Sequence, residues 1–402
     1  MVGMKERPRV YDRILETHFK ENRQMAFVSG PRQVGKTTTC RHESDLYLSW
    51  DILEDQRKII HGPATVANSL ELDRARAKPP VLVFDELHKY PKWKQFLKGF
   101  FDGYGDKAKV IVTGSSRLDL YRRGGDSLMG RYFLYRMHPF SVAEIARTLA
   151  PTAPVQKPSP ISEEDWTALW THGGFPEPYL RRSDSFTRRW RSFRLTQLAK
   201  EDLREVTMLQ DLGTMEVLVQ ILGERSGQQL TYAGLAQDTN IAGDTAKRWV
   251  GLLEQMHYGF RVAPWFKSVA NSLRKEPKWF LRDWSGVADE GARAETFVGC
   301  HLLKAVQGWT DLGLGTFELR YLRTKLRKEV DFLVVKEGKP WLLVEVKLSE
   351  RTISPALKDF QNALGAQYAF QVVVNLPYEE VDCFGFRTPT VVPARTFLSQ
   401  LM

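Results

Sequence analysis

One short motif near the amino end most constrains what this chain can fold into. Residues 26–39 read AFVSGPRQVGKTTT: an apolar stretch runs into Gly30, four residues follow, and the letters GKT open a helical pattern. Glycines allow successive backbone N–H groups to turn inward, and with a helix N-terminus these groups cradle the phosphates of a nucleotide. We therefore expect a phosphate-binding loop formed by Gly30, Pro31, Arg32, Gln33, Val34, Gly35, Lys36, Thr37 and Thr38.

Two carboxylates farther along the chain have the pattern of a partner motif. Residues 81–88 read VLVFDELH, which predicts a buried strand with Asp85 and Glu86 at its carboxyl end. In such a site Lys36 neutralises phosphate charge, the Thr37 hydroxyl coordinates Mg²⁺, and Asp85 holds the same ion through water. Glu86 polarises the attacking water, so we expect ATP and Mg²⁺ as cofactors and hydrolysis as the reaction. The alternative is a solvated acidic pair at the end of an ordinary strand.

A third apolar stretch carries hydroxyl side chains. Residues 109–117 read KVIVTGSSR, which predicts a strand that ends near Thr113, Ser115 and Ser116. These hydroxyl groups would lie beside the γ-phosphate and sense its presence, which makes Ser115 a candidate nucleotide ligand. Small hydroxyl residues also end strands because they favour turns, and this second interpretation stays open.

Arginine residues after this strand are candidates for a catalytic charge. An ATPase of this type usually needs a positive charge against the γ-phosphate in the transition state. Arg131, in the stretch MGRYFLYRMHPF, is the first candidate, followed by Arg136 and Arg117. If a neighbouring copy of the chain supplies this arginine, the protein forms a dimer or a ring. An ordinary surface arginine is the alternative at each position.

The composition favours a folded protein with a basic surface. The chain of 402 residues has 58 Lys and Arg against 48 Asp and Glu, a formal net charge of +10, and 43% of its residues are hydrophobic. Apolar runs are shorter than the ~18 residues of a membrane helix, and the charged start has no signal-peptide core. Cys40, Cys300 and Cys383 are far apart, which excludes a disulfide framework and a CxxC-type zinc site. We expect a cytoplasmic protein without a membrane partner; the basic excess permits a nucleic-acid partner but does not establish one.

Changes of periodicity divide the chain into four segments. Short β-rich runs alternate with helical patterns over residues 1–150, which predicts a parallel sheet with crossover helices. The proline-rich stretch PTAPVQKPSP then begins a segment of helical periodicity, residues 151–225, expected to form a lid and connector. Residues 226–285 have a helix–turn–helix pattern followed by two short aromatic strands, and residues 286–402 return to an α/β pattern. The expected fold class is therefore α/β.

The segment around residues 230–256 predicts a winged helix–turn–helix. Thr231 is placed to cap a first short helix, a tight turn follows at 238–240, and Gly243 or Asp244 opens a second helix. The polar face of the second helix and a basic loop that resembles a wing provide candidate DNA contacts: Thr245, Lys247, Arg248, Arg274 and Lys275. Upstream arginines would add phosphate contacts or lie on a solvated helix: Arg181, Arg182, Arg188, Arg189, Arg191 and Arg194. A structural spacer or a protein-docking surface is the alternative.

Carboxylates on two apolar strands mark a second candidate site near the carboxyl end. Charged groups in the stretches EVDFLVV and WLLVEVKLS are costly unless they meet a partner or a metal ion. Asp331 and Glu345 would bind Mg²⁺, and Lys347 would position or activate water against a phosphodiester. Glu295 shares a helical stripe with apolar residues and points to the same place. The alternative is a scaffold that grips DNA, with Glu345 and Lys347 in a structural ion pair. Nearby basic residues would contact phosphates under either interpretation: Arg320, Arg323, Lys325, Arg327 and Lys328.

Several motifs together resemble known protein families. The chain resembles a widespread prokaryotic group of AAA-type ATPases in six motifs: GPRQVGKTT, DELHKYPKW, TGSSR, the Gly130–Arg131 pair, HGGFPEPYL (172–180) and EDL (201–203). This resemblance implies an AAA-type core with a helical lid and a homo-oligomer, up to a hexameric ring. The D…ExK arrangement of Asp331, Glu345 and Lys347 resembles the restriction-endonuclease-like fold, often written PD-(D/E)xK. Val330 stands where that pattern has proline.

The order of ATPase, winged helix and nuclease-like fold predicts a function on DNA. We expect Mg-ATP turnover that remodels or translocates duplex or branched DNA, with metal-dependent strand scission as a candidate second activity. Two alternatives stay open. One is a nucleotide-gated switch that binds a protein or an operator; the other is a defence nuclease that ATP licenses.

Overall fold

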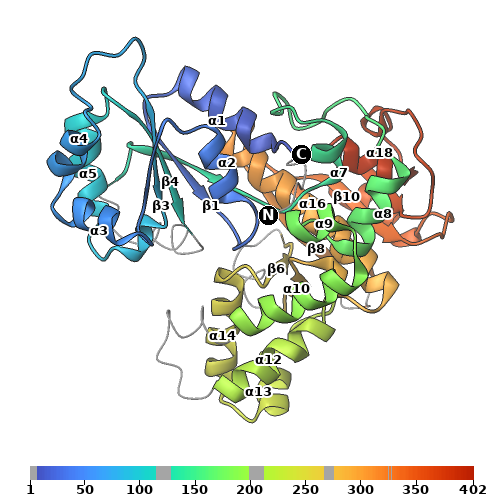
Figure 1. Ribbon diagram of the computed structural model, residues 1–402. Coiled ribbons are helices and arrows are strands. Elements are labelled where there is room, and N and C mark those ends of the chain that lie inside the picture. Colours follow the sequence, from blue (N-terminus) through green and yellow to red (C-terminus); the bar gives the residue numbers. More distant parts are fainter. Residues whose placement is uncertain (1–6, 115–127, 199–211, 267–275, 325, 327) are drawn as a thin grey trace. The chain divides into compact units, whose positions relative to one another are not determined.

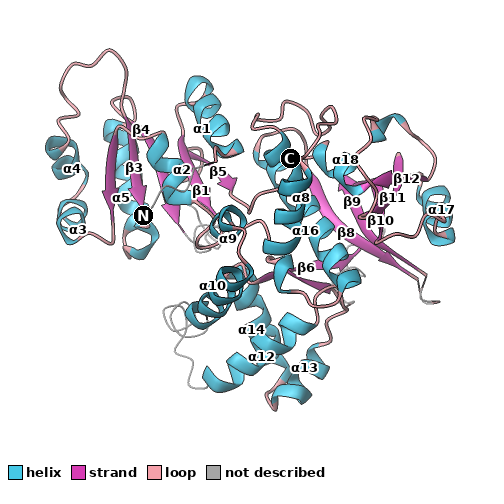
Figure 2. Ribbon diagram, turned by 45° about the vertical axis from the view of Figure 1, so that its right-hand side comes forward, coloured by secondary structure: helices cyan, strands magenta, loops and turns pink. Residues whose placement is uncertain are grey.

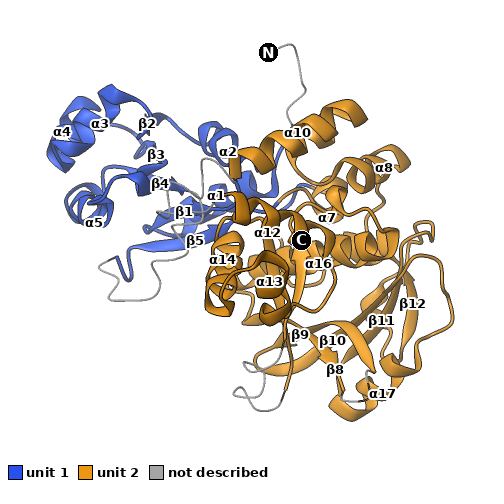
Figure 3. Ribbon diagram, turned by 90° about the horizontal axis from the view of Figure 1, so that it is seen from below, with its two compact units in different colours: residues 1–138, 148–150 blue, residues 139–147, 151–402 orange. Residues whose placement is uncertain are grey.

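The computed structural model describes residues 7–114, 128–198, 212–266, 276–324, 326 and 328–402 (Figure 1). The chain forms two compact units, which Figure 3 colours separately. Unit 1 comprises residues 1–138 and 148–150, and unit 2 comprises residues 139–147 and 151–402.

Unit 1 is built on a parallel sheet. Its described strands have the order β2-β3-β4-β1-β5, and every neighbouring pair is parallel. Strands buried on both faces read as continuous apolar runs, as AFVS and VLVF do here. The predicted parallel sheet is therefore confirmed. The strands are β1 (Met25–Ser29), β2 (Leu46–Ser49), β3 (Val81–Asp85), β4 (Lys109–Gly114) and β5 (Tyr132–Arg136).

Helices cover both faces of this sheet (Figure 2). On one face, α3, α4 and α5 pack over an aromatic core in which Phe84 meets Phe96 and Phe100 edge-on, with ring centroids 5.4 and 5.3 Å away. The loop before α2 carries the glycine motif, so the end of β1 and the start of α2 place it at the carboxyl edge of the sheet. The α-helices in the described part of unit 1 are α1 (Val10–Glu21), α2 (Lys36–His42), α3 (Leu53–Ile60), α4 (Pro63–Ser69) and α5 (Trp93–Tyr104).

Unit 2 contains a mixed sheet with the order β12-β11-β10-β9-β8-β6-β7. Strands β8, β9 and β10 form an antiparallel meander, and β10, β11 and β12 are parallel. The expected wing strands β6 and β7 pair with each other, and β6 also pairs with β8, so the sheet extends across the expected boundary at 285/286. The strands are β6 (Gly259–Pro264), β7 (Lys278–Leu281), β8 (Phe317–Arg323), β9 (Glu329–Lys336), β10 (Lys339–Lys347), β11 (Tyr368–Val373) and β12 (Thr390–Pro393).

The long helix α16 packs against β7, β8, β9 and β10, and its apolar residues supply much of that contact. Residues 151–160 contain neither helix nor strand. Among the described residues of unit 2, the α-helices are α7 (Val142–Ala146), α8 (Glu163–His172), α9 (Pro176–Arg181), α10 (Asp184–Gln197), α12 (Leu212–Glu224), α13 (Tyr232–Thr239), α14 (Gly243–Gln255), α16 (Glu290–Asp311), α17 (Pro355–Leu364) and α18 (Ala394–Ser399).

The predicted helix–turn–helix corresponds to α13 and α14. Asn240 takes a left-handed conformation, with φ of 53°, and turns the chain between the two helices. Trp249 and Leu253 of α14 and Leu235 of α13 are buried in one shared core. Thr231 lies at the predicted cap position of α13, but its side chain makes no capping hydrogen bond, so that detail of the prediction is wrong.

Candidate functional site

The glycine loop of unit 1 has a backbone that its sequence requires. Gly30 has a φ of +155°, and a Cβ atom there would lie 2.3 Å from the carbonyl oxygen of Met137. Gly35 has a φ of +99° at the N-cap of α2, a conformation that L side chains rarely adopt. Both glycines are therefore needed for the chain to turn tightly from β1 into the helix.

Lys36 lies in the first turn of α2 and is buried. Its Nζ donates hydrogen bonds to the carbonyl oxygens of Gly30 and Pro31, both at 2.9 Å. Burial lowers the pKa of the Lys36 ammonium, and the charges of Glu86 and Asp85 act in the opposite direction. The ammonium therefore lies inside the loop that would hold the phosphates.

Asp85 ends β3 and accepts hydrogen bonds from several hydroxyl groups. The Thr37 hydroxyl lies 3.2 Å from one carboxylate oxygen and 3.5 Å from the other. The hydroxyl groups of Tyr47 and Thr113 also donate to this carboxylate. Burial and the bond to Asp85 raise the pKa of Tyr47, which keeps its hydroxyl protonated as a donor. The hydroxyl groups that donate to the Asp85 carboxylate are thus all neutral.

Tyr47 is a further residue of this site that the sequence motifs do not point to. Strand β2 lies beside β3, and Tyr47 is paired in register with Val83. The Tyr47 side chain therefore reaches Asp85, at the carboxyl end of the neighbouring strand, although the two residues are far apart in sequence. A tyrosine hydroxyl in a strand of a buried sheet needs a polar partner, and that requirement was the available signal.

Glu86 follows Asp85 in a left-handed conformation, with φ of 55°. Its backbone N–H donates to the Thr113 hydroxyl at 3.2 Å, which fixes the turn at the end of β3. Its carboxylate lies 3.6 Å from the Lys89 ammonium. Burial raises the pKa of Glu86, against the attraction of Lys36 and Lys89. A carboxylate held in this way is suited to accept a hydrogen bond from an attacking water.

These residues fit a magnesium nucleotide. Thr37 and Asp85, the two residues expected to act on the metal, are hydrogen-bonded neighbours. Lys36 and the backbone of the glycine loop lie at the same edge of the sheet. The remaining loop residues Arg32, Gln33, Val34 and Thr38 lie between or beside these groups, and Gln33 has a positive φ of 62°.

The remaining candidates for the nucleotide site are the predicted catalytic arginine and the residues that follow β4. Arg131 forms a two-point ion pair with Asp102, with nitrogen–oxygen distances of 2.8 and 3.0 Å. It would have to give up this pair to act on a neighbouring copy. Ser115, Ser116 and Arg117 lie outside the described residues.

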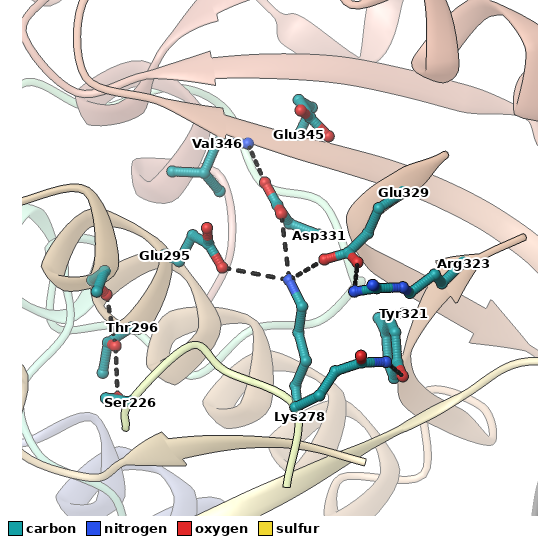
Figure 4. A network of polar contacts seen from close by, with 12 residues as sticks. Ser226, Lys278, Glu295, Thr296, Tyr321, Arg323, Glu329, Asp331, Glu345 and Val346 are labelled. Carbon is teal, nitrogen blue, oxygen red and sulfur yellow. Dashed lines mark hydrogen bonds and ion pairs between the residues drawn. The ribbon is translucent and has the colours of Figure 1, made fainter. Parts of the chain in front are cut away.

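A second cluster of charged side chains lies in unit 2 (Figure 4). The ammonium of Lys278, on β7, is 3.3 Å from Glu295, 2.5 Å from Glu329 and 3.4 Å from Asp331. The Lys278 side chain is 4% exposed. Arg323 also pairs with Glu329, at 2.8 Å. The structure therefore brings the predicted Glu295 and Asp331 together around a lysine that the sequence analysis did not select.

Glu345 and Lys347 lie next to this cluster on β10. The Lys347 ammonium donates to Glu345 at 2.8 Å, and the other oxygen of Glu345 is buried without a hydrogen-bond partner. Burial and the charge of Asp331 raise the pKa of Glu345 to about 7. Asp331 accepts the backbone N–H of Val346 at 2.9 Å. Within the described residues, no three His, Cys, Asp or Glu side chains are arranged to hold a metal ion.

The candidate DNA contacts divide into exposed and paired residues. Lys247 and Arg248 are exposed on α14, and Thr245 is half-buried. In the basic hairpin, the described residues pair with carboxylates: Arg320 with Glu318, Arg323 with Glu329, and Lys328 with Asp359. Four candidates lie outside the described residues: Arg274, Lys275, Lys325 and Arg327.

Comparison with protein families gives a match over the part of the chain that contains the first of these sites. A family model described as an AAA domain matches residues 22–146, which include the glycine loop, Asp85 and Glu86. This segment is similar to the AAA domain family. The match supports the AAA-type resemblance expected from the motifs for this part of the chain. Two further models, both described as domains of unknown function (DUF8612 and DUF4143), match residues 163–288 and 290–396 and assign no activity.

Similar proteins extend over most of the chain. Uncharacterised proteins of Mycobacterium bovis and Mycobacterium tuberculosis are each 24% identical over 349 residues, which cover 83% of this chain and 73% of theirs. A solved signal transduction ATPase with numerous domains, with a tetratricopeptide repeat sensor, from Pyrococcus horikoshii aligns with 78% of this chain. It is 14% identical with a TM-score of 0.23, and this chain covers 50% of its length. Within the described residues, no helix is both long and apolar enough to cross a membrane.

Proposed function

We propose that this protein is an ATPase whose turnover is coupled to DNA. The AAA-type domain supports ATP hydrolysis. The observation that supports DNA as the partner is the exposed pair Lys247 and Arg248 on the second helix of a compact helix–turn–helix. In proteins of this architecture the second helix enters the major groove, and basic side chains on it neutralise phosphates.

The nucleotide would be held by the loop from Gly30 to Thr38. Lys36 would exchange its bonds to loop carbonyls for bonds to phosphate oxygens, and Thr37 and Asp85 would hold Mg²⁺. When bound, Mg²⁺ would neutralise charge that develops on the phosphates. Glu86 would orient the attacking water, and its raised pKa favours acceptance of a proton.

Arginines on α10 and at the C-cap of α9 differ in exposure and in their partners. Arg188 and Arg189 are exposed, whereas Arg182 pairs with Glu164 and Asp165. Arg191 donates to the carbonyl oxygen of Ser285, and Arg194 stacks over Phe175 at 3.8 Å. The proposal therefore assigns phosphate contacts to the exposed arginines Arg188 and Arg189, and structural roles to the others.

The test is ATP hydrolysis measured without DNA and with linear duplex, single strand or a four-way junction. We expect one DNA form to stimulate turnover in the wild type. The double variant Lys247→Ala/Arg248→Ala should lose most of that stimulation and reduce the salt dependence of DNA binding by about two units of slope. The matched control is Arg351→Ala/Lys358→Ala, which removes two exposed charges elsewhere in unit 2. Absence of stimulation by every DNA form would refute the proposal.

A nucleotide-gated binding switch is a second candidate function. The observation that favours it is the closed set of internal bonds: Lys36 to loop carbonyls, and hydroxyl groups to Asp85. A nucleotide must replace several of these bonds, which links its binding to local rearrangement. A switch predicts slow hydrolysis and a nucleotide-dependent affinity for its partner. A motor, meaning an ATPase that moves along or remodels DNA, predicts multiple turnovers and a rate of ATP hydrolysis that increases with DNA length. Assembly into a ring, with Arg131 supplied to a neighbour, belongs to the motor proposal.

A further inference from the structure

Helix α10 of unit 2 (Figure 1) has one buried face and one exposed face. On the buried face, the Thr187 hydroxyl bonds to the ring of His172 of α8 at 3.0 Å. The buried Trp190 ring lies 5.2 Å from the ring of Phe175, which precedes α9. The helix is therefore anchored through these side chains, and the side chains opposite them point to solvent.

The exposed face of α10 combines two arginines with two large apolar side chains. Arg188 and Arg189 are exposed, and neither forms an ion pair with another described residue. Phe193 is 61% exposed and Leu195 is 40% exposed. The helical repeat places Leu195 at one edge of this face and Phe193 at the other, with the arginines between them. Arg189 and Phe193, four residues apart, are neighbours on the helix surface.

Phe193 differs from the other aromatic side chains of α10 in having an open ring face. Arg181 lies over the Phe186 ring, 4.2 Å from its centroid, and Arg194 lies over the Trp190 ring at 5.4 Å. Within the part of the chain that the structure describes, no aromatic ring and no cation is stacked on Phe193. Its ring is therefore available to stack on a partner.

A basic surface with an open aromatic ring has the chemistry that recognises an unpaired nucleic-acid strand. Arginines neutralise the phosphates of duplex and single strand alike. A base that stacks on an aromatic ring gains free energy, but in a duplex each base is already stacked on its neighbours, so an unpaired strand offers its bases at lower cost. An apolar partner fits less well, because it would bury two arginines without a counter-charge.

We propose that the exposed face of α10 binds single-stranded nucleic acid, with Arg188 and Arg189 on its phosphates and a base stacked on Phe193. This inference rests on the proposed function in taking nucleic acid as the partner. It goes further in assigning the unpaired strand to a surface separate from the second helix of the helix–turn–helix. A branched substrate would then present duplex to α14 and single strand to α10.

The experiment follows the fluorescence anisotropy of labelled oligo(dT), and of a labelled duplex of the same length, during titration with the full-length protein. Phe193→Ala should weaken binding of oligo(dT) about 10-fold or more, because a stacked base is lost, and leave duplex binding within about twofold of wild type. The slope of log affinity against log salt should not change, because no phosphate contact is removed. Phe193→Trp keeps an aromatic face and should retain the affinity.

The arginines provide a complementary measurement. The double variant Arg188→Ala/Arg189→Ala should reduce the salt slope for oligo(dT) by about 1.4, at roughly 0.7 for each phosphate contact. The matched control is Leu195→Ala, which removes an exposed apolar side chain without an aromatic face from the same helix. It should leave the affinity for oligo(dT) unchanged. Because all these side chains are exposed, the variants should fold as the wild type does.

Several outcomes would overturn the proposal. Wild-type affinity for oligo(dT) in Phe193→Ala would exclude stacking on the ring. An equal loss in Leu195→Ala, or self-association of the wild type that Phe193→Ala abolishes, would make the face an apolar docking surface instead. If oligo(dT) does not bind while duplex DNA stimulates ATP hydrolysis, this inference fails and the proposed function stands; if no DNA form binds, both fail.

Discussion

Two acidic sites in this protein have similar sequence signatures and different surroundings. Asp85 lies at the end of a parallel strand and accepts bonds from the hydroxyl groups of Thr37, Tyr47 and Thr113. Asp331 lies on β9, within 3.4 Å of the Lys278 ammonium. Both carboxylates are buried, yet the partners of the first are neutral and the main partner of the second is charged.

The difference in partners decides which carboxylate is available to a metal. Hydroxyl donors stabilise a carboxylate without cancelling its charge, so the attraction for Mg²⁺ remains. An ammonium cancels that charge, and its removal leaves an uncompensated buried carboxylate. A strand-end carboxylate is therefore available to a metal only when no ammonium is paired with it.

The largest expected effect tests the first of the two sites. Lys36→Ala removes the buried ammonium that would meet the phosphates, so ATP turnover should fall about 10³-fold or more. Phosphate release under saturating ATP measures this. The control Lys20→Ala removes an exposed lysine paired with Glu16 in the same unit and should leave turnover unchanged. Turnover above a tenth of the wild-type rate in Lys36→Ala would remove the loop from the mechanism.

Glu86→Gln should separate binding from hydrolysis. The amide keeps the size of the side chain but cannot accept a proton, so we expect kcat to fall about 10²-fold while nucleotide affinity changes by less than about threefold. Fluorescent-nucleotide titration and single-turnover hydrolysis measure the two quantities. Equal losses of affinity and rate would mean that Glu86 holds the nucleotide instead of the water.

The charged cluster of unit 2 predicts a dependence of stability on pH. The pKa of Glu345 is raised to about 7, by burial first and then by Asp331, so the folded state binds more protons than the unfolded state between about pH 4.5 and 7. Stability should therefore fall as pH rises through this window, by roughly 1–3 kcal/mol. Glu295 shares the same direction, with a pKa of about 7.

Glu345→Gln isolates this contribution. In this variant the stability should fall less as pH rises through the same window, and the fall that remains should come from Glu295. Urea unfolding at several pH values measures the slope, and Glu380→Gln, at an exposed carboxylate, is the matched control. A wild-type stability that rises over the same interval would contradict the sign.

Much of the nucleotide site could be predicted because its determinants are local in sequence. The glycine loop needs its backbone angles at Gly30 and Gly35, and both residues lie within one short stretch. The strand VLVFD places Asp85 at a sheet edge by its apolar pattern alone. The match to the AAA domain family covers the same stretches.

Lys278 could not be assigned from sequence, because its role arises from strands brought together by the fold. It precedes Asp331 by many residues and reaches the cluster through the pairing of β7 with β6 and of β6 with β8. The stretch KWFL nevertheless contained a signal: a lysine within a short aromatic strand needs a buried counter-charge. The aromatic pattern of this strand suggested a wing, and a wing strand gives no indication of a buried partner for its lysine.

The smallest expected effect concerns Tyr47 and tests how neutral donors differ from a charged one. Tyr47→Phe removes a hydroxyl group that donates to Asp85 while Thr37 and Thr113 still donate. The free energy of unfolding should fall by about 0.5–1.5 kcal/mol, because a neutral hydrogen bond is lost and no buried charge is left unpaired. Urea unfolding measures the change, and Tyr90→Phe, whose ring stacks on Trp50 at 4.9 Å, is the matched control. A loss above about 3 kcal/mol, the range for breaking a buried ion pair, would mean that the Tyr47 hydroxyl compensates the charge of Asp85 as strongly as Lys278 compensates that of Asp331.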